Sequence, residues 1–206
     1  MKKIPKLGLI ELNEAYNKVI QWFFSYPILP ISLSDLSSEL SISKKTANQI
    51  VTQLIQENFL FKEEIGKTWR ITCNQKHEYN VTKKISFNLS LVYQLLYEGK
   101  LIDEIYKLTG NPKAIILFGS YRKGDDTENS DLDIAIEVAQ NEELKIINLW
   151  NIQKLGYRKN IPLNLHIFSR NKIDLNLFSN LVNGIVLDGF LEARTLDLNA
   201  QIIKTH

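Results

Sequence analysis

The sequence has little cysteine and little histidine. Its single cysteine, Cys73, excludes an internal disulfide and a zinc site built from cysteines, and it is typical of a protein from a reducing compartment. The three histidines, His77, His166 and His206, lack the spacing of a metal-binding motif. The composition thus gives no indication of a disulfide-bonded or zinc-stabilised fold.

Long apolar runs are also absent. No run approaches the roughly 20 residues that a membrane-spanning helix needs. The first residues, MKKIPKLGLIELNE, are basic but contain few apolar side chains before Glu11, which is unlike a signal peptide. Both observations favour a cytoplasmic protein without a membrane partner.

Neither sign of charge dominates the chain of 206 residues, whose formal net charge is +2. The charge is unevenly divided, however, because residues 1–84 carry a net +4 and the remainder a net −2. The positive excess in the N-terminal part mildly indicates a polyanionic partner there. The length allows one large domain or two small ones.

What the sequence does contain is a distinctive stretch between Ala114 and Glu137. An apolar run, 114–118, predicts a buried strand, and a second strand is expected at 132–137. Side chains alternate along a strand, so Asp131 and Asp133 should share one face about 6–7 Å apart. Such a pair repels unless a cation lies between the two carboxylates, and Mg²⁺ or Mn²⁺ would supply one.

A phosphate-binding turn is predicted directly before this pair. Gly119 lets the backbone approach a ligand closely, and Ser120 could cap the helix expected to follow it. The N-terminus of that helix would present free N–H groups to phosphate. The combination indicates a site for a metal–nucleotide complex, whereas a strand–turn–strand with merely solvated acids would not require the two acids on one face.

The spacing GS-x10-DxD in LFGSYRKGDDTENSDLDIAI resembles the minimal nucleotidyltransferases of the DNA polymerase β superfamily. The resemblance implies transfer of a nucleoside monophosphate from ATP or another NTP to an acceptor hydroxyl, with Asp131 and Asp133 as catalytic metal ligands. It assigns nucleotide binding to four residues: Gly119, Ser120, Lys123 and Ser130. Arg122 departs from the pattern, because the family usually has a small residue there.

The third carboxylate of that family is missing. The stretch LNLHIFS, residues 163–169, aligns with the strand that carries it and places Asn164 at its position. An asparagine has no charge and cannot act as a base. His166, two residues further on, is either a substitute base or ligand or a buried, hydrogen-bonded histidine, and the second interpretation is favoured.

The N-terminal part predicts three helices, at 9–26, 33–40 and 44–58, followed by a hairpin with strands at 59–63 and 68–72. This order resembles the winged helix-turn-helix of DNA-binding regulators, in which the third helix enters the major groove. The resemblance predicts a set of nucleic-acid-binding residues: Lys44, Lys45, Asn48, Gln49, Lys67 and Arg70. The alternative is a protein-interaction or dimerisation module with a solvated polar face.

Further helices are expected at 86–98, 101–108, 141–156 and 171–183, a third strand at 161–168, and a short terminal element at 184–187. Aromatic residues of the first two helices are expected in the core or in a homodimer contact. The predicted fold is therefore α+β. Its parts are a winged helix-turn-helix (1–75), a helical connector (76–112), a polymerase-β-like nucleotidyltransferase domain with a short mixed sheet backed by helices (113–195), and a tail (196–206).

The function expected from these features is metal-dependent nucleotidyl transfer to a protein or RNA acceptor. A second hypothesis is a DNA-binding transcriptional regulator whose degenerate nucleotidyltransferase domain binds nucleotide without turnover. A third is a toxin–antitoxin component that acts on a neighbouring protein.

Overall fold

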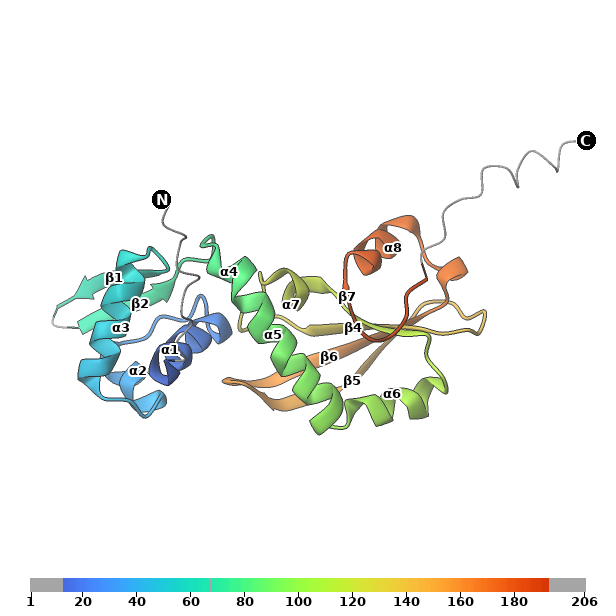
Figure 1. Ribbon diagram of the computed structural model, residues 1–206, viewed down its shortest axis with the longest axis horizontal. Coiled ribbons are helices and arrows are strands. Elements are labelled where there is room, and N and C mark those ends of the chain that lie inside the picture. Colours follow the sequence, from blue (N-terminus) through green and yellow to red (C-terminus); the bar gives the residue numbers. More distant parts are fainter. Residues whose placement is uncertain (1–12, 67, 193–206) are drawn as a thin grey trace, which may run out of the picture.

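The computed structural model describes residues 13–66 and 68–192. It is an α+β protein in which the N-terminal helices and a mixed sheet lie at opposite ends, with helix α5 (Lys84–Tyr93) between them (Figure 1). None of the helices within the described part of the chain has both the length and the apolar character needed to cross a membrane.

The N-terminal module has three helices and a hairpin, as predicted. Each helix begins after a polar residue whose side chain accepts a hydrogen bond from the first turn: Asn13, Ser32 and Ser43. The elements are α1 (Glu14–Ser25), α2 (Leu33–Glu39), α3 (Lys44–Gln56), β1 (Leu60–Ile65) and β2 (Thr68–Cys73). The predicted helical residues 9–12 lie outside the described residues. Buried side chains from all five elements form one core.

The connector is helical over most of its length. It contains α4 (Tyr79–Thr82), α5, a π-helical turn (Gln94–Glu98) and α6 (Leu101–Thr109). The polar segment before α5 thus contains one short helix, α4, which is not among the helices predicted from the sequence. The helices predicted at 86–98 and 101–108 are confirmed.

A five-stranded sheet in the order β5-β6-β4-β3-β7 forms the second module. Its elements are β3 (Ala114–Leu117), α7 (Gly119–Lys123), β4 (Leu132–Glu137), β5 (Lys145–Leu155), β6 (Arg158–Phe168), a 3₁₀ turn (Arg170–Lys172), α8 (Leu175–Val182) and β7 (Ile185–Gly189). Strand β4 is parallel to β6 and antiparallel to β3, so the sheet is mixed.

The two faces of this sheet are covered by different helices. Side chains of α5 and α6 pack against Ile115, Ile134 and Leu165 on one face. Leu181 of α8 packs against Ile116 and Ala135 on the other. Because side chains alternate along β4, Asp133 points to the α8 face together with Ala135.

The helix predicted at 141–156 is wrong, because this segment forms strand β5 paired antiparallel to β6. A bulge between Asn148 and Asn151 inserts one extra residue into the strand. The positions that pack against the sheet core are therefore Ile147, Leu149 and Ile152, spaced two and then three residues apart. That irregular spacing resembles a helical period in the sequence.

Candidate functional site

The candidate site lies where β3 ends and β4 begins, at the centre of the sheet. All four residues of β3 are buried. The chain then turns through Gly119 into the five-residue helix α7 and returns through residues 124–131 to β4. The turn and the start of β4 are thus adjacent in space because β3 and β4 are paired neighbours.

Gly119 is required at this turn for two reasons. Its φ angle is +71°, in the left-handed region that favours glycine. A Cβ atom built on it would lie 2.8 Å from Oδ2 of Asp133, closer than real Cβ atoms approach another atom. The absence of a side chain therefore leaves the Asp133 carboxylate open toward the α7 backbone.

Asp131 and Asp133 converge on a single amide group. Strand β6 pairs with β4 so that Asn164 lies opposite Asp133. Its Nδ2 donates hydrogen bonds to Oδ2 of Asp131 at 3.1 Å and to Oδ1 of Asp133 at 3.3 Å. Asn148 donates to Oδ1 of Asn164 at 3.3 Å, which directs the Nδ2 group toward the carboxylates.

His166 lies on the same face and contacts the same pair. Its Nε2 is 3.2 Å from Oδ1 of Asp133, and its ring stacks edge-on against Phe118. The hydrogen bond from His166 lowers the pKa of Asp133 below its ordinary value, and burial opposes this only in part. His166 is therefore a largely buried, hydrogen-bonded histidine, in agreement with the favoured interpretation.

The two carboxylates fit one hard divalent cation. Their oxygens are the ligand type that Mg²⁺ prefers, they converge on one point, and glycine keeps the space beside Asp133 open. Across the described ranges, however, no group of three or more acidic, histidine or cysteine side chains is arranged to hold a metal. The residues present thus fit a single ion that also uses phosphate and water ligands.

Two basic residues of α7 line a pocket that includes Gly119, the glycine next to Asp133. Arg122 and Lys123 line a pocket of about 190 Å³ together with Phe118, Gly119, Asn180 and Asn183. The last two come from α8 and the residue after it. Sequence reasoning missed both asparagines and treated Arg122 only as a departure from the family pattern, because nothing local to the motif marks residues 60 positions away.

Two predicted nucleotide-binding residues have different surroundings from those expected. Helix α7 begins after Phe118, and no side chain caps it, so Ser120 lies inside the first turn and is not the cap. The Ser130 hydroxyl accepts a hydrogen bond from the Thr127 amide at 2.9 Å and closes the loop before Asp131. Direct nucleotide contacts of these hydroxyls stay predictions.

The predicted nucleic-acid-binding residues lie on the N-terminal module. Lys44, Lys45, Asn48 and Gln49 are exposed on one side of α3. Arg70 is exposed on β2 and lies 3.9 Å from Glu63 on the paired strand. Lys67 lies outside the described residues.

The site thus combines a glycine turn after β3 with a carboxylate pair at the start of the neighbouring strand β4 of a mixed sheet. In a comparison with known families, residues 99–187 match the family model described as "Nucleotidyltransferase domain". This stretch is therefore similar to nucleotidyltransferase domains. The match leaves the N-terminal module and α5 outside it.

One similar protein comes from Methanocaldococcus jannaschii and carries the provisional name of a protein adenylyltransferase. It is 45% identical over 54 residues, which are 26% of this chain and 50% of that protein. The chain thus spans about half the length of the curated relative that it matches.

Proposed function

We propose that this chain transfers the nucleoside monophosphate of ATP to an acceptor hydroxyl, with Asp131 and Asp133 holding one Mg²⁺ or Mn²⁺. The observation that carries the proposal is the convergence of both carboxylates on one point beside the Gly119 turn. Bound there, the ion would neutralise charge on the phosphates and on the departing pyrophosphate.

Residues of α7 bind the phosphates in this proposal. Gly119 lies against the Asp133 carboxylate, and in this proposal the backbone N–H groups of Gly119 and Ser120 bind phosphate while Lys123 supplies a cation for the outer phosphates. Arg122, in the same pocket, has no hydrogen bond or ion pair within the described chain. Basic side chains in a pocket that shares Gly119 with the proposed metal site favour a polyphosphate ligand over a neutral one.

The reaction would be an in-line displacement. The acceptor oxygen attacks the α-phosphorus, the bond from that phosphorus to the bridging oxygen of the β-phosphate breaks, and pyrophosphate leaves with the electron pair. The hydroxyl proton passes to solvent, since Asn164 cannot take it and His166 is engaged with Asp133. The name of the similar archaeal protein makes a protein hydroxyl the first acceptor to test.

A second candidate function is nucleotide binding without turnover, and the position of Asn164 favours it. The amide of Asn164 occupies the point between the carboxylates that a cation would take. A domain with two carboxylates can still bind a metal–nucleotide complex while lacking a ligand for a second ion. This candidate describes a DNA-binding regulator that responds to nucleotide.

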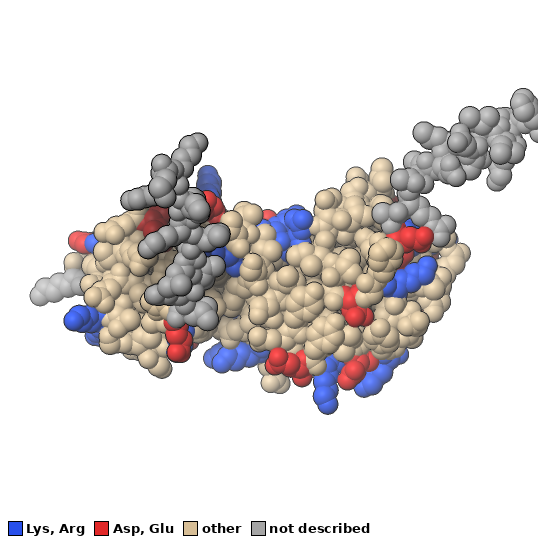
Figure 2. Space-filling model, viewed as in Figure 1, with Lys and Arg blue, Asp and Glu red and all other residues tan. Residues whose placement is uncertain are grey.

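The N-terminal module supports the nucleic-acid part of either candidate. We propose that it is a winged helix-turn-helix, since a hairpin follows three helices and the polar side of α3 is exposed among the described residues. On the face shown in Figure 2, basic and acidic side chains are interspersed and form no broad patch of one sign. Binding would therefore depend on Lys44 and Lys45 of α3 and on Arg70.

The deciding experiment incubates the full chain and a cell extract with Mg²⁺ and ATP labelled at the α-phosphate. The first candidate predicts label on a protein acceptor, and no label when ATP carries it at the γ-phosphate. Asp131→Asn and Asp133→Asn should abolish labelling without loss of stability, because each removes one of two repelling charges. Asp125→Asn, which changes an exposed carboxylate of the same loop, is the matched control.

Nucleotide binding without any transferred label would favour the second candidate. A Lys44→Ala/Lys45→Ala variant should then weaken DNA binding at all sequences and flatten its dependence on salt. If the wild type shows no salt-sensitive binding of DNA or RNA, the N-terminal module is a protein-interaction module instead.

A further inference from the structure

The loop that leads into Asp131 is held by a buried arginine from another element. Arg158, the first residue of β6, is only 5% exposed. Its Nη2 donates to the backbone carbonyls of Glu128 at 3.0 Å and Ser130 at 2.6 Å. Its Nη1 donates to the hydroxyl of Tyr121 in α7. One guanidinium thus connects helix α7 to the peptide directly before Asp131.

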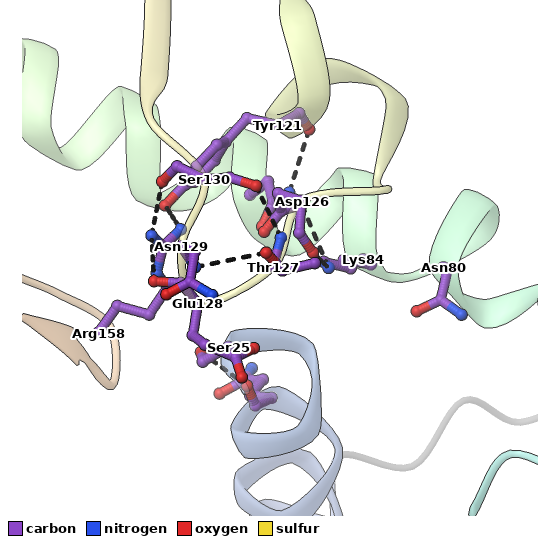
Figure 3. Close-up of polar contacts among 12 residues, drawn as sticks. Ser25, Asn80, Lys84, Tyr121, Asp126, Thr127, Glu128, Asn129, Ser130 and Arg158 are labelled. Carbon is purple, nitrogen blue, oxygen red and sulfur yellow. Dashed lines mark hydrogen bonds and ion pairs between the residues drawn. The ribbon is translucent and has the colours of Figure 1, made fainter. Parts of the chain in front are cut away.

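A buried ion pair holds the same loop from helix α5. Lys84 lies 3.2 Å from Oδ1 of Asp126, and both side chains are almost completely buried. Asn88, one turn further along α5, donates to the same Asp126 oxygen at 2.7 Å and to the carbonyl of Tyr121 at 3.0 Å. In Figure 3, Arg158 and Lys84 reach the loop from two separate elements.

The hairpin that carries Arg158 is anchored on the N-terminal module. Tyr157, at its tip, packs against the N-terminal core. The hydroxyl of Tyr26, the residue after α1, donates to the Tyr157 carbonyl at 2.6 Å. Tyr157 therefore contacts the N-terminal core, and its neighbour Arg158 contacts the loop before Asp131.

Asp131 needs such support. It is exposed, and its only side-chain contact within the described residues is the hydrogen bond from Asn164. Without a cation the Asp131 and Asp133 carboxylates repel each other, so the position of Asp131 depends on its backbone. The planar guanidinium of an arginine can donate to two carbonyls at once in fixed directions. A lysine ammonium can also donate to two carbonyls, but its donors are less restricted in direction.

We propose that Arg158 is a positioning residue for the metal–nucleotide site, acting through the 128–130 backbone on Asp131. This rests on the proposed function, because it assumes that Asp131 binds the metal of a nucleotide complex. A change in a side chain that orients a metal ligand typically weakens metal binding about 10–100-fold. Arg158→Met should weaken binding of the metal–nucleotide by that factor, and Arg158→Lys by less.

The experiment measures binding of Mn²⁺ with the non-transferable analogue α,β-methylene-ATP by calorimetry, on the full chain. Arg170→Met is the matched control. Arg170, like Arg158, donates to a backbone carbonyl, and it also forms an ion pair with Glu137, but it lies beyond the opposite end of β6. Both variants should lower the melting temperature. Only the Arg158 variants should raise the dissociation constant of the analogue.

Hydrogen exchange gives an independent readout. The amides of residues 127–131 should exchange faster in Arg158→Lys than in wild type, while those of β3 should not change. If Arg158→Met does not fold, Arg158→Lys decides alone. Binding of the analogue at wild-type affinity in the folded Arg158 variants overturns the positioning role and leaves the proposed function intact. Failure of the wild type itself to bind the analogue overturns both.

Discussion

Among single residues, Asn164 has the largest effect on the chemistry available to the site. Its amide donates a hydrogen bond to each carboxylate, and the partial positive charge of the N–H groups reduces the repulsion between the two acids. An aspartate at the same place would be nearly identical in volume but would add a third negative charge. The two side chains therefore differ in charge and hardly in shape.

We predict that Asn164→Asp makes the fold depend on metal. Three converging carboxylates raise the pKa of one of them and destabilise the metal-free protein, whereas a divalent cation relieves the repulsion. The melting temperature should fall in EDTA and recover with Mn²⁺, and the initial rate of label transfer should rise at least about 10-fold. Thermal unfolding with and without metal and a time course of labelling measure both.

The opposite result is equally informative. If the wild type transfers label rapidly and Asn164→Asp slows it, the alignment of 163–169 with the third catalytic strand is wrong. His166 would then be the next residue to replace, because it is the other polar side chain that contacts Asp133.

The proximity of Asp131 and Asp133 could be predicted because it depends only on alternation along one strand. The glycine turn could be predicted for the same local reason. Arg158, Lys84 and Asn88 could not, since each reaches the loop from an element more than 25 residues away. No spacing within the motif encodes these contacts.

Among the elements, β5 shows how tertiary pairing can hide a strand. Its bulge places the inward residues Ile147, Leu149 and Ile152 two and then three positions apart, so the apolar residues look helical when the sequence is read alone. The difference matters for the site, because Asn148 reaches Asn164 only from a strand paired with β6. The amphipathic helices α1, α3 and α6 have regular apolar spacing and suitable caps or ends, and they were predicted correctly.

Strand β2 offers a probe of the N-terminal module through Cys73. Burial raises the pKa of its thiol to about 12, although Lys84 nearby opposes this. Because the folded-state pKa exceeds that of the unfolded chain, the thiol's contribution to stability is present below the ordinary pKa and is lost as the pH rises toward 12. Relative to Cys73→Val, the free energy of unfolding should fall above pH 9 by at most about 1.4 kcal/mol per pH unit.

Urea denaturation of wild type and Cys73→Val between pH 7 and 10.5 measures this difference, and the valine variant controls for tyrosine and lysine titration. Parallel pH profiles of the two proteins would mean that the thiol is accessible to water in the folded state. If the thiol is buried as expected, a thiol reagent should label native Cys73 no faster than strand β2 opens.

In the whole molecule, the Lys84–Asp126 pair joins α5 to the loop of the nucleotidyltransferase domain. Lys84 and Asn88 lie before residue 99, outside the stretch that matches the family. Nevertheless, they form an ion pair and a hydrogen bond with the carboxylate of Asp126, which lies within that stretch. Burial raises the pKa of Asp126, and the charge of Lys84 is the main effect that opposes the rise. The domain therefore contains a buried acid whose partner comes from the connector.

Removing only Lys84 should be costly, because Lys84→Met leaves the Asp126 carboxylate buried without its cation. Loss of one member of a buried pair typically destabilises a protein by about 3–5 kcal/mol. The double variant Lys84→Met/Asp126→Asn removes both charges and keeps an oxygen that can accept from Asn88, so it should recover most of this loss.

The pH dependence of the single variant distinguishes a charge effect from a packing effect. In Lys84→Met the pKa of Asp126 in the folded state rises further above that of the unfolded chain. The protonated acid is then tolerated in the fold. The loss of stability relative to wild type should therefore be small below about pH 4, the ordinary range of an aspartate. It should grow as the pH rises from there through the folded-state pKa. Urea denaturation of wild type, the single variant and the double variant between pH 3.5 and 7.5 measures it. A deficit that is the same at every pH, and that persists in the double variant, would show that the methylenes of Lys84 stabilise the contact between α5 and the loop by packing, independently of its charge.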